Sequence, residues 1–230
     1  MRTYMRLIFT VTILLAPGIA AAQEPTWAVS GRVGVVSDYR DRGYTLSDEG
    51  PAVQGEVTLA HTSGLYAGVW GSGIAEYGIG ADGDGAEVEV TFYTGWAGTV
   101  GGFDVDAAVW SNVYPGGEDV NYVEFPLEIG RAIGETTLSA GVIWAPAQTG
   151  TGDQSNTWMW TRAEYAPEAW PVSLHAVLGY EDGGFAPEGK TDWRVGADAP
   201  VGGFTLSLDW VDSDTEDSAI VASVFRDFAF

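Results

Sequence analysis

Two arginines, Arg40 and Arg42, stand on either side of Asp41 in the segment SDYRDRGYTLSDEG. The chain has only 10 Lys and Arg against 32 Asp and Glu, so two cations in one turn need a physical reason. A guanidinium group can form two parallel hydrogen bonds to a carboxylate. We therefore expect a salt-bridged clamp that fixes this loop, and the alternative is a basic surface that binds an anion. The predicted clamp residues are Asp38, Arg40, Arg42, Asp48 and Glu49.

Carboxylates also recur at every second residue elsewhere in the chain. FDVDAAVW places Asp104 and Asp106 on one face of an extended segment, and AEVEVTFYTGW does the same with Glu87 and Glu89. The residues between them are mostly apolar. Alternation with a period of two predicts β-strands that have one polar and one apolar face.

The residue types give little support for catalysis. A nucleophilic mechanism needs a base beside a Ser or Cys, but the chain has no Cys and only two histidines. His61 falls in a predicted turn, and His175 points inward from a predicted strand of the barrel that is described below. Neither histidine has an obvious Ser partner at the outer rim of that barrel. We predict no enzymatic activity, no catalytic residues and no cofactor.

Two acidic segments resemble calcium-binding loops. DGDG (82–85) and DSDTED (212–217) carry oxygen ligands, but neither has a Glu at the twelfth position of a calcium loop. We therefore predict no specific metal site, and loose binding of divalent cations at the cell surface stays open.

The whole chain repeats the period-two pattern, which predicts an all-β fold. Most of the runs have 9 to 13 residues, longer than the roughly 5 or 6 of soluble sheets and close to the roughly 9 to 11 that cross a bilayer at a tilt. About twelve strands are expected, at 27–39, 51–61, 65–75, 86–98, 102–113, 120–131, 135–146, 157–166, 171–181, 191–199, 203–212 and 218–230.

The connections between these strands alternate in length. Even-numbered connections are short, whereas most odd-numbered ones are longer and acidic, such as 41–50, 76–85 and 181–190. Tight periplasmic turns and longer outer loops are typical of outer-membrane barrels. A soluble β-sandwich also alternates apolar and polar residues, but it does not predict this parity of loop lengths. Residues 23–230 are therefore predicted to form a single transmembrane, antiparallel, up-and-down β-barrel.

Three residues test this assignment. Pro126 lies inside predicted strand 120–131 and needs a bulge or a break there, because a closed barrel has no edge strand. Arg226 shares the lipid-facing parity of the last strand, so it must reach the rim or lie in a distorted strand. The terminal Phe230, after alternating apolar residues, is typical of barrels that the barrel assembly machinery recognises.

The first 22 residues, MRTYMRLIFTVTILLAPGIAAA, have the basic start, short apolar run and Ala-x-Ala end of a secretory signal peptide. Its removal leaves 8 Lys and Arg against 32 Asp and Glu, a net charge of −24. This charge excludes nucleic acid as a partner, because nucleic acid needs a basic face. The expected location is the Gram-negative outer membrane, and the expected partners are outer-membrane lipid, lipopolysaccharide and small solutes.

If the apolar parity faces lipid, the polar parity fills the lumen. Uncompensated charges are costly in a dry interior, so these groups must be paired or face water. The lumen-lining candidates are Arg32, Glu56, Glu87, Glu89, Asp104, Asp106, Glu124, Arg162, Arg194 and Asp209.

Aromatic residues near the predicted strand ends are expected in two interfacial girdles, with Trp158 and Trp160 alternatively lining the outer opening. The girdle residues are Trp27, Tyr39, Tyr66, Trp70, Trp96, Tyr114, Trp144, Trp158, Trp170, Trp193 and Trp210.

The segment SDYRDRGYTLSDEGPAVQG, followed by HTSGLYAGVWGS, resembles the TorF-type porins of proteobacteria. The later segments EVEVTFYTGWAG, VYPGGEDVNYVE, WAPAQ and DWRVGADAP are similar to the same family, so the likeness covers nearly the whole chain after the signal peptide. The resemblance implies a twelve-stranded outer-membrane barrel that conducts small solutes. Asp41 stands where that family usually has an aromatic residue, and this added carboxylate favours the salt-bridged clamp.

The surplus of acids on the lumen parity predicts a porin-like channel for passive diffusion of small solutes that prefers cations. Eight strands are filled by their own side chains and sixteen to eighteen enclose an open channel, so twelve strands leave limited room. The alternative is a narrow or plugged structural or surface-binding barrel without general pore activity.

Overall fold

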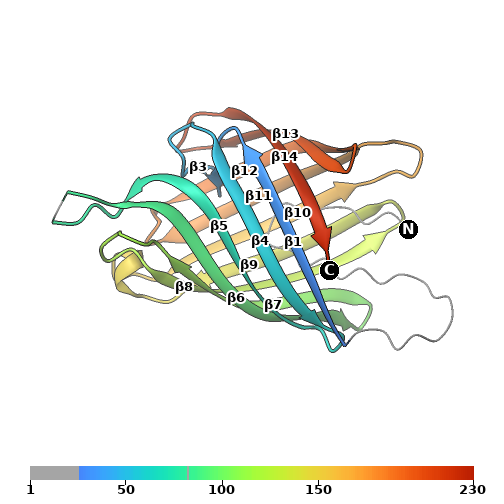
Figure 1. Ribbon diagram of the computed structural model, residues 1–230, viewed down its shortest axis with the longest axis horizontal. Coiled ribbons are helices and arrows are strands. Elements are labelled where there is room, and N and C mark those ends of the chain that lie inside the picture. The colour runs from blue at the N-terminus through green and yellow to red at the C-terminus, as the bar shows by residue number, and fades with distance from the viewer. Residues whose placement is uncertain (1–25, 82) are drawn as a thin grey trace.

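Twelve long antiparallel strands of the described residues close into one barrel (Figure 1). The computed structural model describes residues 26–81 and 83–230, so the predicted signal peptide lies outside the described residues. The predicted all-β barrel is confirmed. The strands are β1 Trp27–Val36, β4 Ala52–His61, β5 Leu65–Tyr77, β6 Ala86–Val100, β7 Phe103–Val113, β8 Tyr122–Ile133, β9 Thr136–Ala145, β10 Asn156–Tyr165, β11 Ser173–Gly183, β12 Ala186–Val201, β13 Phe204–Ser213 and β14 Ala219–Ala229. A short hairpin, β2 Arg40–Asp41 and β3 Tyr44–Thr45, and a 3-10 turn at Thr149–Thr151 lie in the loops.

The first and last strands close the sheet. β1 pairs with β4 on one side and with β14 on the other, from Ser30↔Ala229 to Val36↔Ser223. No unpaired edge therefore remains along the twelve described strands, which is the way a barrel satisfies its backbone groups. The long connections gather at one end, on the left in Figure 1, and the short turns at the other. We call these ends extracellular and periplasmic.

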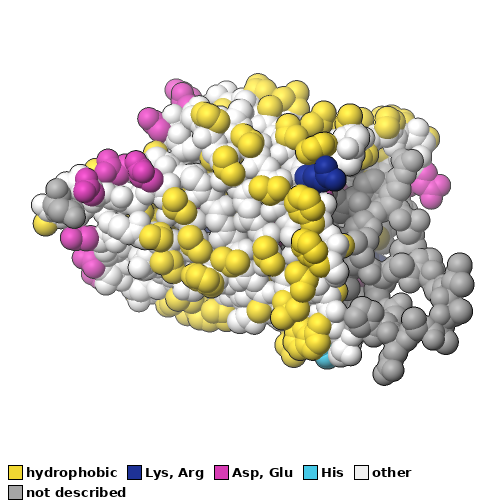
Figure 2. Space-filling view, viewed as in Figure 1, with side chains coloured by type: hydrophobic (Ala, Val, Ile, Leu, Met, Phe, Trp, Pro, Cys, Tyr) yellow, Lys and Arg dark blue, Asp and Glu magenta, His cyan; other side chains and the backbone are white. Residues whose placement is uncertain are grey.

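Side chains alternate between the two faces of the wall. On β6, Val88 and Phe92 are 45% and 55% exposed on the outside, whereas Glu89 and Thr91 are buried inside. Figure 2 shows the resulting apolar cover over the outer wall, with acidic residues gathered at the extracellular end. Among the described residues, no helix is long and apolar enough to cross a membrane.

Two expectations about individual residues need correction or refinement. β8 runs through Pro126 in constant register with β9, and only its pairing with β7 is interrupted around Phe125 and Pro126, so there is neither a bulge nor a break. A missing N–H costs one ladder bond without bending the strand. β14 is likewise regular around Arg226, whose guanidinium lies 5.4 Å from the Phe204 ring and 5.7 Å from the Phe228 ring near the periplasmic end.

The predicted girdles are wrong in part. Trp27, Trp144 and Trp210 are exposed on the outside, whereas Trp170 lies exposed in the connection after β10 and lines the cavity in the lumen. Parity, rather than nearness to a strand end, decides which face a side chain takes. The predicted girdle residues that lie inside the barrel are Tyr39, Tyr66, Trp70, Tyr114 and Trp158.

The segment 181–190 is not the long loop that its acidic and Gly-rich sequence suggests. β11 extends to Gly183 and β12 begins at Ala186, with one register shift between Glu181 and Gly183. Lys190 consequently sits in a strand, fully buried inside the barrel. This difference decides which residues meet in the lumen.

The seam between β1 and β14 generates a stability prediction. Gly34 pairs with Phe225, and a Cβ on Gly34 would lie 2.2 Å from a Phe225 ring carbon and 2.4 Å from the Val224 carbonyl oxygen. We expect Gly34→Ala to lower the free energy of unfolding by about 1–3 kcal/mol through overpacking. Gly73→Ala is the control, because nothing lies within 4 Å of a Cβ at that strand position. Equal urea midpoints for the two refolded variants would contradict the packing at the seam.

Candidate functional site

The first extracellular connection, residues 37–51, folds into the barrel, and we call it the L1 loop. Its hairpin turns at Arg42 and Gly43, with φ of 48° and 88°. Two-residue hairpin turns require positive φ at both positions, which Gly accepts freely and Arg adopts at a cost of about 1 kcal/mol or more. A Cβ on Gly43 would lie 2.9 Å from Cβ of Ser213, so the turn sits against the wall at β13.

Arg42 reaches across the lumen from this turn. Its Nη2 lies 2.8 Å from Oε1 of Glu124 on β8, and its Nη1 lies 3.0 Å from Oε1 of Glu181 on β11. β8 is on the far side of the closed sheet from β1, where the L1 loop begins. The loop therefore crosses the barrel and is fastened to the opposite wall.

Wall residues support both carboxylates. Asn112 Nδ2 donates to Glu124 at 3.2 Å, and Asn156 Nδ2 donates to Glu181 at 2.9 Å. Lys190 Nζ lies 2.7 Å from the other Glu181 oxygen and also donates to the Arg42 carbonyl. We call the set of Arg42, Glu124, Glu181 and Lys190 the Arg42 latch.

Opposing effects act on the Arg42 charge. Burial lowers the pKa of the guanidinium, but Glu124, Asp41 and Glu181 outweigh burial and hold that pKa above its ordinary value. Arg42 is therefore a permanent cation inside the barrel. Removing it would leave Glu124 without a cationic partner.

Arg40 fixes the base of the L1 loop. Its Nε lies 2.6 Å from Oδ2 of Asp38, and its Nη1 donates to the Asp217 carbonyl at 2.7 Å. Arg194 on β12 donates to the Arg40 carbonyl at 3.1 Å. These contacts join the loop to itself and to the wall at β12 and the last extracellular connection.

The structure places the predicted clamp residues unequally. Asp38, Arg40 and Arg42 form buried ion pairs, as a clamp requires. Glu49 is exposed, 3.9 Å from Arg40, and Asp48 is exposed in the turn that follows β3. The main acceptors for Arg42 are therefore wall residues, not Asp48 and Glu49 as the sequence suggested, because the loop turns inward.

Tyr39 ties the L1 loop to a third part of the wall. Its hydroxyl donates to Oε2 of Glu89 on β6 at 2.9 Å, and the Tyr114 hydroxyl donates to Oε1 of the same carboxylate at 3.0 Å. Burial, and then the neighbouring Glu89, raise the pKa of the Tyr39 phenol well above its ordinary value. Tyr39 therefore stays protonated and remains a donor.

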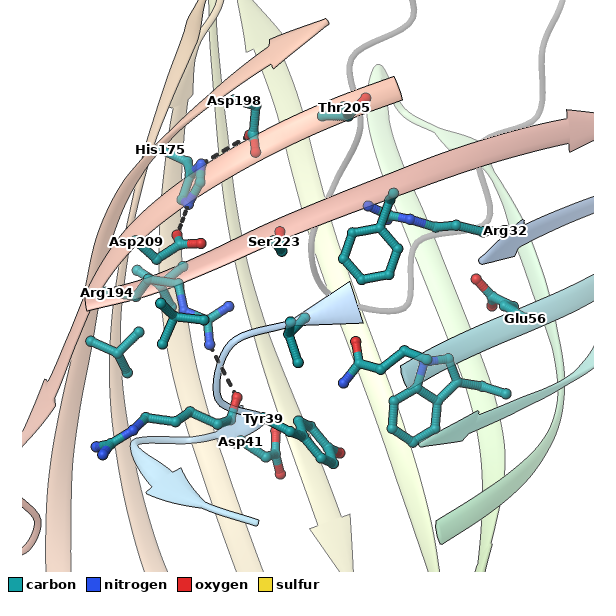
Figure 3. Close-up of a pocket in the computed structure, with 18 of the residues that line it drawn as sticks. Arg32, Tyr39, Asp41, Glu56, His175, Arg194, Asp198, Thr205, Asp209 and Ser223 are labelled. Atoms are coloured by element: carbon teal, nitrogen blue, oxygen red, sulfur yellow. Dashed lines mark hydrogen bonds and ion pairs between the residues drawn. The ribbon is translucent and has the colours of Figure 1, made fainter. Parts of the chain in front are cut away.

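A cavity of about 960 Å³ lies in the lumen against the L1 loop (Figure 3). On one side His175 bridges two carboxylates, with Nδ1 3.1 Å from Asp198 and Nε2 2.6 Å from Asp209. Arg32 and Glu56 face this group from the other side in Figure 3. The charged wall of the cavity consists of five arginines, Arg32, Arg40, Arg42, Arg162 and Arg194, and ten carboxylates, Asp38, Asp41, Glu56, Glu89, Glu124, Glu164, Asp192, Asp198, Asp209 and Asp227.

Seven of the ten lumen candidates line this cavity, and the other three do not. Asp106 accepts a hydrogen bond from the Tyr66 hydroxyl beside a smaller cavity. Asp104 lies exposed near the periplasmic end, 3.0 Å from the Thr99 hydroxyl. Glu87 is exposed at the start of β6. The seven that line the cavity are Arg32, Glu56, Glu89, Glu124, Arg162, Arg194 and Asp209.

An aromatic cluster fills another part of the lumen. It contains Tyr66, Tyr93, Trp110, Ile143, Trp158 and Trp160, all at most 8% exposed. These residues come from β5, β6, β7, β9 and β10, so the cluster takes space on one side and leaves the cavity against the others. The open part of the lumen is therefore narrower than the full interior that the twelve strands enclose.

The two histidines have different partners in the structure. His175 is held by two carboxylates that accept hydrogen bonds. His61 contacts the Ser63 hydroxyl at 2.8 Å, but the pair is exposed at the periplasmic turn, away from the cavity. Among the described residues, no group of three or more His, Asp and Glu is placed to hold a metal.

The closed wall, the apolar outer face and the charged lumen define the architecture of a transmembrane β-barrel. The KdgM porin superposes with a TM-score of 0.60 at 6% identity, over 87% of this chain and 99% of that chain. The COG4313 outer membrane channel from Pseudomonas putida F1 gives 0.52 at 15% identity, over 94% and 100%. At these identities the likeness concerns the fold.

The chain belongs to the Gcw_chp family, described as bacterial proteins of unknown function, whose model matches residues 20–229. No functionally curated protein matches the sequence. The resemblance to the TorF-type porins stays a prediction.

The Arg42 latch generates the second prediction. Breaking a buried ion pair on one side costs about 3–5 kcal/mol, so Arg42→Ala should lower the free energy of unfolding by about 3 kcal/mol and free the L1 loop. Trypsin should then cleave after Arg40, whose side chain is only 2% exposed in the latched loop. Urea unfolding and timed trypsin digestion measure the two effects. Asp48→Asn, at an exposed loop position, should behave as the wild type, and an equally resistant Arg42→Ala would contradict the latch.

Proposed function

We propose that the protein is an outer-membrane channel for passive diffusion of small solutes, narrowed by the L1 loop and selective for cations. The observation that carries the proposal is the cavity wall, on which ten carboxylates face five arginines and His175. Fixed negative charge in a water-filled lumen raises the local concentration of cations and repels anions.

The pairing of the arginines strengthens this argument. Arg40 forms an ion pair with Asp38, and Arg42 forms ion pairs with Glu124 and Glu181 in the Arg42 latch. Glu56, by contrast, accepts a hydrogen bond from the neutral Tyr93 hydroxyl, and Asp192 accepts one from the Trp158 indole. Neutral donors add no positive charge beside these carboxylates, and the ten carboxylates outnumber the arginines and His175 of the cavity wall, so the net charge of that wall is negative.

The comparisons support a channel and leave its solutes open. The KdgM porin and the COG4313 channel share the fold, and the TorF-type resemblance implies conduction of small solutes. A KdgM structure holds disordered oligogalacturonate, but a sugar acid of that kind would meet like charge in this cavity. We therefore propose neutral and cationic solutes instead.

The proposal also places the protein in the outer membrane and assigns its partners there. The outer wall would contact outer-membrane lipid and lipopolysaccharide. Phe230, 87% exposed after β14, would be the contact for the barrel assembly machinery.

A plugged barrel that serves as a structural or surface-binding protein is the alternative. The observation in its favour is the burial around the latch, where Lys190 is 0% and Glu181 is 1% exposed. Leakage of small neutral sugars from vesicles that contain the folded protein separates the two functions. Leakage supports the channel, and retention supports the plug.

Ion selectivity is the third prediction. In planar bilayers under a salt gradient, the reversal potential should have the sign of a cation-selective pore, and Glu56→Gln should reduce its magnitude by removing a cavity carboxylate. Glu188→Gln is the matched control, since Glu188 is exposed on the extracellular hairpin and does not line the cavity. A closed barrel without unit conductance, or a clear preference for anions, would rule out the proposed function.

The size of the opening is the fourth prediction. Arg42→Ala should raise the unit conductance several-fold, because the L1 loop loses its attachment to β8 and β11. Arg42→Lys keeps the charge but forms no planar two-armed contact, so its conductance should lie between those of the other two proteins. Identical conductance in all three would show that the L1 loop does not limit the pore.

A further inference from the structure

The wall opposite the start of the L1 loop forms a complete guanidinium-binding site. Glu124 and Glu181 each direct one carboxylate oxygen at a different Nη atom of Arg42, at 2.8 and 3.0 Å. The Trp158 ring completes the site, with the guanidinium carbon 5.4 Å from its centre. Two carboxylates and an aromatic ring are the groups that recognise a planar, delocalised cation.

The carboxylates of this site are held by other residues of the wall. Glu124 is held by Asn112 from β7, and Glu181 is held by Asn156 from β10 and by Lys190 from β12. All of these residues stand on strands of the closed barrel. The site is therefore preorganised, and preorganised sites lose little free energy to ordering when a ligand binds.

The L1 loop holds Arg42 less firmly than the strands hold the wall residues. Arg42 has a left-handed φ of 48°, a conformation with a cost that the contacts of the latch must offset. The hairpin that carries it has strands of only two residues. Arg42 is thus a ligand of the wall site that the L1 loop tethers. Its backbone is held in a conformation that residues other than glycine disfavour.

The site borders the cavity in the lumen. Arg42, Asn112, Glu124 and Trp158 all line the cavity of about 960 Å³. A solute in that cavity meets Glu124 and Trp158 directly, whereas Glu181 does not line the cavity and is contacted by Arg42.

We propose that this wall site binds free guanidinium-bearing solutes, such as arginine or short arginine-containing peptides, in competition with Arg42. Binding of the solute displaces the Arg42 side chain and detaches the L1 loop from β8 and β11. The route by which the solute reaches the site rests on the proposed channel function, but binding itself does not. A tethered competitor has an effective concentration in the millimolar range, so the wild type binds the solute weakly and a protein without Arg42 binds it more tightly.

Calorimetry on the full-length protein, refolded in detergent, tests the proposal. Arg42→Ala should bind L-arginine about tenfold or more tightly than the wild type does, because the tethered competitor is gone. L-citrulline, which has the same shape without the charge, should give no binding. Arg42→Ala combined with Glu124→Gln should lose the arginine site, whereas Arg42→Ala combined with Asp48→Asn should keep it.

A heat-modifiable band on electrophoresis confirms that each variant is folded, and Arg42→Lys provides a second test if Arg42→Ala does not fold. Arginine should bind Arg42→Lys more tightly than the wild type, since lysine fills the site poorly. Absence of arginine binding in the folded variants, equal binding of citrulline, or binding that survives Glu124→Gln would overturn the proposal. If the barrel binds arginine but shows no conductance, the binding site is supported and the proposed channel function is rejected. If the barrel conducts but does not bind arginine, the channel function is supported and the binding site is rejected.

Discussion

The cost of taking charge out of water shapes the interior of this barrel. A buried ion that lacks a partner costs several kcal/mol, and β8, β11 and β12 carry buried charges on their inward faces, among them Glu124, Glu181 and Lys190. Each must therefore find a partner or border water. Arg42 meets this demand at the extracellular side by joining Glu124 and Glu181, and the cavity meets it elsewhere by leaving room for water beside the remaining carboxylates.

This constraint explains why the L1 loop lies inside. The wall presents two carboxylates with one nearby lysine, Lys190, which pairs with Glu181. The missing cation comes from the loop, because Arg42 is the residue at its tip. Once it is fastened there, the L1 loop and the aromatic cluster together narrow the lumen around the cavity of about 960 Å³. In the proposed channel, the charge of that cavity would distinguish one solute from another.

Much of the architecture could be predicted from the sequence, because alternation of apolar and polar residues directly encodes which face of a strand meets lipid. The strands and the inward parity of Glu89 and Asp209 follow from that pattern. The partners of Arg42 could not be predicted. Glu181 and Lys190 stand in a Gly-rich acidic segment that reads as a loop, and their pairing depends on strands far apart in the sequence. Tyr66 and Trp70 show the same limit, since an aromatic near a strand end suits the interface as well as the lumen.

The position of the L1 turn inside the lumen is the central claim, and an engineered disulfide tests it most directly. The chain has no cysteine, and a Cβ on Gly43 would lie 2.9 Å from that of Ser213. This distance is shorter than the roughly 3.8 Å between the Cβ atoms of a disulfide, so a small outward shift of the turn permits the bond. Gly43→Cys with Ser213→Cys should cross-link in the folded protein, whereas Gly43→Cys with Ser63→Cys, at the periplasmic turn, should not. If the folded Gly43→Cys, Ser213→Cys variant kept both of its introduced thiols free under oxidising conditions, that result would contradict the account.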